Sequence, residues 1–201
     1  MEKRTWSLYV AAIAVALTVA TASNTFAQTS LVAEGRLALD AGKVDDALAI
    51  FEKAVAANPN DPAALAWLGN AQVRKTSTVA LFERPDWVRK GFETLDRAVA
   101  RFPNEFVVYL VRGNTGARVP PMFGKAPVAI KDLHAVIDTH AKNPGAVPQS
   151  VMPSVYLNLG LAHKQNGDPA AARAAWEKGK ALYPQAPEAA AMDNELKSLS
   201  P

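Results

Sequence analysis

Histidines are the side chains in this chain best suited to acid–base or metal chemistry, and two of the three lie close together in the stretch HAVIDTH. His134 and Asp138 are one helical turn apart and share a face of a helix, whereas His140 points elsewhere. A protein zinc site needs three or four converging ligands, and no HExxH pattern is present. We therefore expect solvated helix residues here and no metal site. His163, far along the chain, is expected to be a partly buried spacer.

No set of residues for covalent or phosphoryl-transfer catalysis can be assembled from the sequence. The chain has no cysteine, which excludes thiol catalysis, disulfides, thiolate metal sites and lipid anchors carried on cysteine. It also has no GxSxG motif, no Walker A loop and no GxGxxG after a strand. The sequence therefore predicts a protein that is not an enzyme and uses no cofactor.

A repeated hexapeptide offers binding chemistry instead. GNAQVR starts at Gly69 and GNTGAR starts at Gly113, so Gly-Asn-x-x-x-Arg recurs after 44 residues. An asparagine amide both donates and accepts hydrogen bonds, so it can hold the backbone of an extended peptide. An arginine forms forked bonds to carboxylates. This chemistry suits an extended or acidic peptide segment.

The N-terminus has the three-part pattern of a secretory signal peptide. Lys3 and Arg4 precede an uncharged stretch of 17 residues from Trp6 to Ala22, and TFAQ follows. The predicted signal peptide is 1–27, cut between Ala27 and Gln28 or, alternatively, after Ala22. The rival interpretation is an uncleaved inner-membrane anchor, because the apolar stretch is at the lower limit of the about 17–25 residues that span a bilayer. A cleaved, exported chain favours a periplasmic or secreted location.

The charge of the chain argues against nucleic acid as a partner. The 201 residues carry 22 Lys and Arg and 19 Asp and Glu, a formal net charge of +3. Phosphate binding usually requires a concentrated basic stripe, and no dense run of Lys or Arg is present.

Apolar residues at helical spacing dominate the rest of the chain, and no strand alternation is found. Helices are predicted near 30–41, 44–58, 61–75, 86–102, 105–117, 126–141, 150–165, 168–182 and 187–199. Three of them end at prolines, which cannot continue a helix: Pro59, Pro103 and Pro184. Asp-Pro pairs at 61–62 and 168–169, and Asn104-Glu105, are expected to cap helix starts. Long connections are predicted at 75–85 and 118–127.

Three of these helices share one set of spacings, which reveals a repeat. Ala47, Phe51, Ala54 and Pro59 are separated by 4, 3 and 5 residues; the same spacings recur in Gly91, Leu95, Ala98 and Pro103 and in Ala172, Trp176, Gly179 and Pro184. The preceding helices share Leu-x-x-Leu-Gly at 65–69 and Tyr-x-x-Leu-Gly at 156–160. These patterns resemble the tetratricopeptide repeat family, whose unit of 34 residues is a pair of antiparallel helices.

The resemblance implies an all-α tetratricopeptide solenoid of about four helix-turn-helix units in a domain covering 28–201. The expected units are about 28–61, 62–105, 106–152 and 153–186, and 187–199 is expected to be a capping helix. Gly35, Gly69, Gly113 and Gly160 occupy the small-residue position of each first helix, where the two helices of a unit approach closely. The proline spacings give the second unit 10 extra residues and the third unit 13.

The resemblance also implies where a partner would bind, since first helices of this family line a concave groove. It places Arg36, Asn70, Asn114 and Leu161 in the groove, and Asp40, Arg74, Arg118 and Gln165 one turn further, with Lys164 beside the last. The alternative for Arg74 and Arg118 is that they are solvated residues near helix C-termini. Apolar residues of the two long connections, Phe82, Trp87, Met122 and Phe123, either contact a partner or fold back over the core.

Function is predicted from these features together. The expected protein is a non-catalytic periplasmic adaptor or assembly factor whose groove holds an extended or acidic segment of another protein. One alternative is a structural module that self-associates as a homo-oligomer. Another is a binder of an acidic envelope polymer or small ligand. Contact with a membrane is expected only if the signal segment stays uncleaved.

Overall fold

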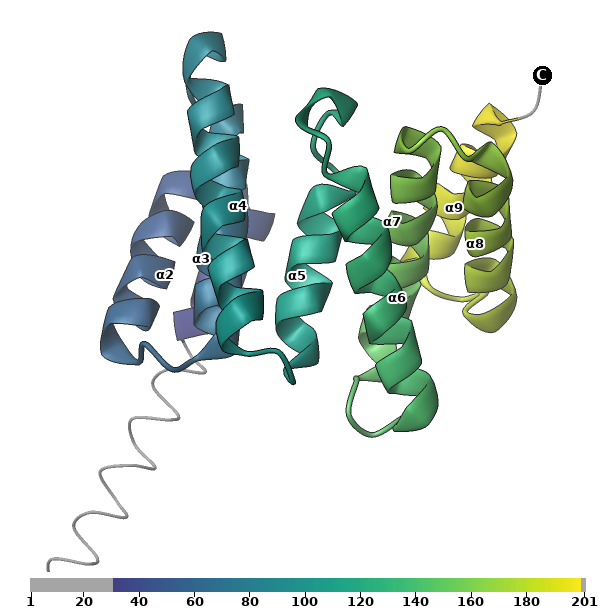
Figure 1. Ribbon diagram of the computed structural model, residues 1–201, viewed down its shortest axis with the longest axis horizontal. Helices are drawn as coiled ribbons and strands as arrows, with labels where there is room; N and C mark the ends of the chain where they lie inside the picture. Colours follow the sequence, from purple (N-terminus) through teal and green to yellow (C-terminus); the bar gives the residue numbers. More distant parts are fainter. Residues whose placement is uncertain (1–30, 200–201) are drawn as a thin grey trace, which may run out of the picture.

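The computed structural model describes residues 31–199, and all of its regular structure is helical (Figure 1). Within this range there are nine α-helices and no strand, which confirms the all-α expectation. The predicted signal segment 1–27 lies outside the described residues. None of the described helices is long and apolar enough to cross a membrane.

The helices follow the predicted order and lie within a few residues of the predicted bounds. They are the helix over 31–40, α2 (Val44–Ala57), α3 (Pro62–Arg74), α4 (Arg84–Arg101), α5 (Phe106–Gly116), α6 (Ala126–Lys142), α7 (Met152–Gln165), α8 (Pro169–Leu182) and α9 (Pro187–Ser198). The helix over 31–40, α3, α5 and α7 are the first helices of successive pairs. The second helices are α2, α4, α6 and α8.

Helix ends are set by the residues that the sequence marked, with one exception. The Asp61 carboxylate accepts hydrogen bonds from the backbone N–H groups of Ala63 and Ala64, and Asp168 does the same for Ala171. The predicted cap at 104–105 is wrong: the residue before α5 is Glu105, and its side chain makes no capping bond. There the backbone N–H of Val108 bonds to the Glu105 carbonyl instead, so the turn closes without a carboxylate.

Small residues allow the two helices of each pair to approach closely, as expected. A Cβ atom added to Gly69 would lie 2.9 Å from the carbonyl oxygen of Gly91, and one added to Gly91 would lie 2.8 Å from the carbonyl oxygen of Gly69. In the other pairs, a Cβ on Gly35 would meet the ring of Phe51 at 2.6 Å, and one on Gly113 would meet Leu133 at 2.8 Å. These glycines are therefore required by helix packing.

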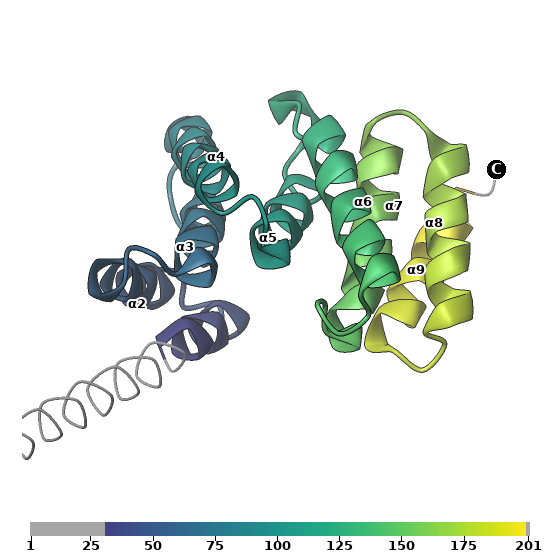
Figure 2. The same cartoon turned by 60° about the horizontal axis from the view of Figure 1, so that its bottom comes forward.

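The pairs stack side by side, so that the first helices form the inner side of a curve. Helix α3 packs against α5, α5 against α7 and α7 against α9, whereas successive second helices do not pack extensively on one another. Figure 2 shows α2, α4, α6 and α8 on the outer side of this arrangement. We call the surface made by the helix over 31–40, α3, α5 and α7 the inner surface.

The core is divided along the stack. One cluster of buried residues surrounds Trp176 and Tyr156 of the last pair, a second surrounds Phe92 and Leu95 of α4, and a third lies around Phe51 of α2. Helix α9 covers the end of the stack with the buried Met192, while its polar side chains stay outside. This is how a terminal helix closes a repeat array.

The two long connections fold into short 3₁₀ turns. The first contains η1 (Lys75–Ser77) and η2 (Leu81–Glu83), and the second contains η3 (Pro121–Phe123). Another turn, η4 (Gln149–Val151), precedes α7. In Figure 1 the connections before α4 and before α6 both lie at the upper edge of the stack, where each first helix passes to its second helix.

Candidate binding surface on the first helices

The two asparagines of the repeated hexapeptide join neighbouring first helices. Asn70 on α3 donates from Nδ2 to Oγ1 of Thr115 on α5 at 2.8 Å. Asn114 on α5 accepts at Oδ1 from Nδ2 of Asn158 on α7 at 2.9 Å. Both bonds reach adjacent residues of α5, one from the first helix on either side. These side chains therefore fix the spacing of first helices, in addition to any contact with a partner.

Two further predicted residues also reach the adjacent first helix or its end. Arg74 donates from Nη2 to the carbonyl oxygen of Leu39 at 3.0 Å, and Gln165 donates from Nε2 to the carbonyl oxygen of Ala117 at 2.8 Å. A helix has unpaired carbonyls in its last turn. Gln165 satisfies such a carbonyl across the unit boundary, whereas the Leu39 carbonyl that Arg74 reaches also accepts from the backbone N–H of Gly42. Neither contact was predicted from the sequence.

Replacing Asn70 and Asn114 together by alanine is expected to lower the free energy of unfolding by about 1–3 kcal/mol, since each lost hydrogen bond contributes about 0.5–1.5 kcal/mol. Urea denaturation followed by circular dichroism measures this. Asn194→Ala is the control, because Asn194 is exposed on α9, away from the contacts between first helices. An Asn70→Ala/Asn114→Ala variant as stable as this control would show that the two bonds do not hold the first helices together.

The cationic side chains predicted to line the groove differ in the contacts that they make within the protein. Lys164 is occupied, because its Nζ lies 2.8 Å from Glu195 Oε2 and 2.9 Å from Ser198 Oγ of α9. Arg36 is exposed, and its guanidinium lies over the ring of Trp67 at 5.0 Å from the centroid. Arg118 is exposed and forms no ion pair with a described residue. Arg74 and Lys164 are exposed as well, but each has a hydrogen-bond partner, so Arg36 and Arg118 are the cations of the set without one among the described residues.

Arg36 lines a cleft between the helix over 31–40 and the start of α3. Its volume is about 280 Å³, and it is lined by Val32, Ala33, Arg36, Asp61 and Ala63. The remaining predicted groove residues are Asp40, which is exposed, and Leu161, which is half-buried against the core. A guanidinium stacked on an indole at the wall of a cleft can receive a carboxylate or a backbone carbonyl.

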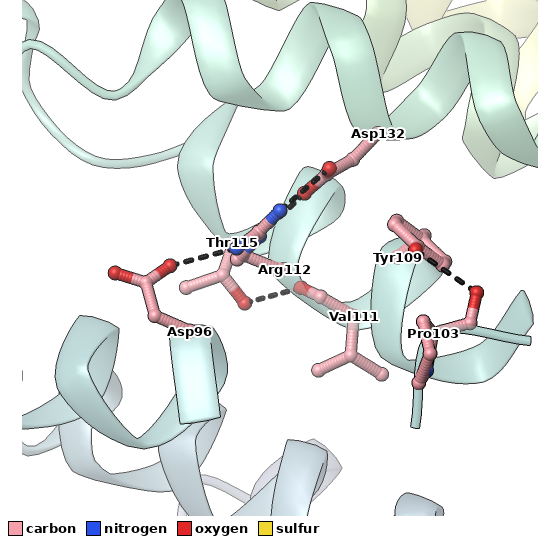
Figure 3. Close-up of polar contacts among 7 residues, drawn as sticks. All are labelled: Asp96, Pro103, Tyr109, Val111, Arg112, Thr115 and Asp132. Atoms are coloured by element: carbon pink, nitrogen blue, oxygen red, sulfur yellow. Dashed lines mark hydrogen bonds and ion pairs between the residues drawn. The ribbon is translucent and has the colours of Figure 1, made fainter. Parts of the chain in front are cut away.

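The strongest polar contact of the stack involves residues that the sequence did not single out (Figure 3). Arg112 on α5 donates to both carboxylate oxygens of Asp132 on α6, from Nε at 2.7 Å and from Nη2 at 2.9 Å, and its Nη1 lies 2.8 Å from Asp96 on α4. The Asp132 side chain is 0% exposed. One guanidinium therefore joins the second helix pair to both helices of the third.

Burial and hydrogen bonding shift the pKa values of Arg112 and Asp132 in opposite directions. Burial raises the pKa of the Asp132 carboxyl above its ordinary value, against the opposing effect of the bonds from Arg112. Burial also acts to lower the pKa of Arg112, but the bonds to Asp132 and Asp96 outweigh it and raise that pKa. One sequence signal could have revealed the pair: Asp132 interrupts the buried apolar stripe of Ala129, Leu133 and Val136.

The two histidines of α6 point apart, as the sequence predicted. His140 Nδ1 lies 3.2 Å from the carbonyl oxygen of Val147, away from His134. His134 instead meets His163 of α7 edge to face, with ring centroids 6.1 Å apart. Both rings line a cleft of about 360 Å³ between α6, α7 and α8 that also contains Lys178. No group of three or more metal-binding side chains occurs among the residues that the structure describes.

The His163 imidazole is expected to make stability depend on pH in mild acid. Burial lowers the pKa of His163, and the neighbouring His134 lowers it further, against a smaller opposing effect of Asp168. The unfolded chain therefore binds more protons, so stability is expected to fall as the pH drops through about 6.5, the unfolded pKa, toward the folded value. Urea midpoints at pH 7.5 and pH 5 measure this loss. His163→Gln should reduce the difference, and an unchanged difference would assign it to other groups.

The apolar residues predicted on or beside the long connections have different environments, and one of them, Trp87, lies in the first turn of α4 and not in a connection. Phe82 is 82% exposed and Met122 is 86% exposed. Trp87 is half-buried, with Lys90 Nζ 4.8 Å from its ring centroid. Phe123 packs against the core cluster of α4. The second connection thus covers the core with one side chain and exposes its neighbour.

Comparisons with known proteins identify two repeat segments and the fold. Tetratricopeptide repeat profiles match residues 32–78, which hold the first helix pair and α3, and residues 153–178, which hold α7 and most of α8. A solved structure, that of a thermophilic TPR protein from Thermus thermophilus, aligns with a TM-score of 0.60 and 22% identity over 86% of this chain and 80% of that one. No curated protein matches the sequence.

Helices α4, α5 and α6 lie between the two matched segments, and α3 with α4 and α5 with α6 pair in the same way as α7 with α8. Proteins built from these repeats are in general scaffolds that bind other proteins. The chain thus contains tetratricopeptide repeats at 32–78 and 153–178, and its stack of helix pairs has the fold of a tetratricopeptide repeat protein.

Proposed function

We propose that this protein is an exported, non-catalytic adaptor that holds an extended segment of another protein along its inner surface. The export step rests on the signal-peptide pattern of residues 1–27. The binding step rests on one observation: hydrogen bonds between first helices set the shape of the inner surface, and Arg36 and Arg118 remain exposed beside it.

A preformed surface favours binding because little ordering is needed when the partner arrives. The Asn70–Thr115 and Asn114–Asn158 bonds hold α3, α5 and α7 at fixed spacing before any partner is present. An extended chain has unpaired carbonyls along its length, and exposed guanidinium groups donate to carbonyls and carboxylates. The proposed ligand is therefore an extended segment that carries carboxylates.

Charge reversal at the inner surface tests the proposal. The Arg36→Glu/Arg118→Glu variant is expected to retain less than about a tenth of the partner that the wild type captures from an exported-protein extract, because two attractive contacts become repulsive. Captured proteins are quantified by mass spectrometry. Lys53→Glu/Lys142→Glu is the matched control, since both lysines are exposed on second helices and the change in charge is the same.

If the amount of captured partner fell equally in the Arg36→Glu/Arg118→Glu variant and in its lysine control, that result would argue against binding on the inner surface. Folding is monitored in parallel by circular dichroism. If the captured partner is a second copy of this chain, the self-association alternative is favoured. The molecular mass of the protein in solution then gives its oligomeric state.

A further inference from the structure

Exposed apolar side chains gather on the turns that lengthen the two middle units. Leu81 and Phe82 on η2 are 74% and 82% exposed, and Met122 on η3 is 86% exposed. Most surface apolar residues of a soluble protein are isolated and need no explanation. These three differ because they occupy the tips of turns, and the repeat itself does not require those turns.

The two turns share one edge of the stack. Each joins a first helix to its second helix, η2 before α4 and η3 before α6, and Figure 1 shows both connections at the upper edge, in neighbouring units. The three side chains line neither the cleft beside Arg36 nor the cleft beside His134. They are therefore exposed on a rim outside both clefts, which we call the insertion edge (residues 75–90 and 118–125).

The insertion edge is strongly basic. Residues 75–90 contain four Lys and Arg and two Asp and Glu, and residues 118–125 contain two basic residues and no acidic one, a formal surplus of four positive charges. The whole chain has a net charge of only +3, so the remainder is slightly acidic. Positive charge is thus concentrated where the apolar tips lie.

Part of this charge has no internal partner. Lys75 pairs with Asp45, and Arg89 pairs with Asp86 and Glu93. Arg84 and Arg118 are exposed, and neither pairs with an acidic residue in the described part of the chain. Lys90 lies over the half-buried Trp87, whereas Lys125 lies at 4.4 Å over the buried Phe92 of the core. A partly exposed indole with a cation nearby is suited to a boundary between apolar and aqueous phases.

We propose that the insertion edge docks on a bilayer of anionic phospholipid. Apolar tips that protrude can enter the acyl boundary of a deformable surface, while the surrounding Lys and Arg contact the phosphate groups. A protein partner would instead have to supply deep pockets for three separate side chains. Such docking leaves Arg36 and the first helices of the inner surface free for their own ligand, whereas Arg118, just after α5, adjoins both surfaces.

The absence of cysteine allows a direct test on the full-length protein. Single cysteines are introduced as Met122→Cys and, at the opposite edge, as the control Leu182→Cys; Leu182 is also apolar and 52% exposed. Each is labelled with an environment-sensitive fluorophore and mixed with vesicles of phosphatidylglycerol and phosphatidylcholine or of phosphatidylcholine alone. A local label separates the insertion edge from any effect of the apolar segment at 6–22.

The label at position 122 is expected to shift to the blue with anionic vesicles, to lose the shift in high salt, and to stay unchanged with neutral vesicles. The label at 182 is expected to stay unchanged throughout. In vesicle sedimentation, Phe82→Asp/Met122→Asp is expected to weaken binding at least about tenfold relative to Leu182→Asp. A label at 122 that responds no more than the label at 182 would overturn the proposal, as would a response that requires an added protein.

Discussion

Replacing Arg112 by alanine is expected to lower the free energy of unfolding by about 3–5 kcal/mol, because it leaves the Asp132 carboxylate buried without its partner. That side chain is 0% exposed and takes both of its strong hydrogen bonds from Arg112. The loss should appear as a lower urea midpoint in both circular dichroism and tryptophan fluorescence. Because Arg112 joins the second pair to the third, the transition should also become less cooperative.

Two control variants separate this effect from ordinary truncation. Asp96 is 58% exposed, so Asp96→Asn should cost no more than about 1 kcal/mol. The double variant Arg112→Met/Asp132→Leu removes both charges and should recover much of the stability that Arg112→Ala loses. If Arg112→Ala were no more harmful than Asp96→Asn, the buried pair would have no special role at this junction.

Gly160→Ala is expected to destabilise the protein by about 3 kcal/mol, at the upper end of the cost of overpacking a core. The added Cβ would lie 2.1 Å from Nε1 of Trp176, which is fully buried and donates to the carbonyl oxygen of Leu157 at 2.9 Å. The indole has to move away from that carbonyl, and its buried N–H then loses its hydrogen-bond partner. A thermal unfolding scan with tryptophan fluorescence measures both the stability and the movement of the ring.

Gly145→Ala is the matched control for this replacement. A Cβ at Gly145 would meet only the Asn143 side chain, at 3.5 Å, so the same change should be nearly neutral. Trp176→Phe makes room for the added methyl group. Gly160→Ala should therefore cost less stability in a Trp176→Phe protein than it does in the wild type. A Gly160→Ala protein as stable as Gly145→Ala would contradict the close approach of α7 and α8.

The fold could be predicted from the sequence because its determinants are local. Helices α2, α4 and α8 each end two residues before a proline, at Pro59, Pro103 and Pro184, and each Asp-Pro pair starts a helix. Gly69 and Gly160 mark the helix approaches because no larger residue fits there. Spacing along one chain is enough to reveal such features.

The polar contacts between units could not be predicted because they depend on how one pair is rotated against the next. Asn70 was expected to face a ligand, but its amide also reaches Thr115, 45 residues away. Arg112 and Asp132 are on different helices, and no spacing rule relates them. Met122 and Phe123 are adjacent residues in one turn, yet the first is exposed and the second is packed, because the insertion has no counterpart in the repeat.

The central claim is that the inner surface holds a segment of another protein, and site-specific photocrosslinking in the source cells tests it most directly. A photoreactive benzophenone residue is placed at Arg36 or Arg118 beside the inner surface, and at Lys53 or Lys142 on second helices. We predict one common adduct at positions 36 and 118 and none at 53 or 142. Adducts that form equally at all four positions, or only at 53 and 142, would contradict the account.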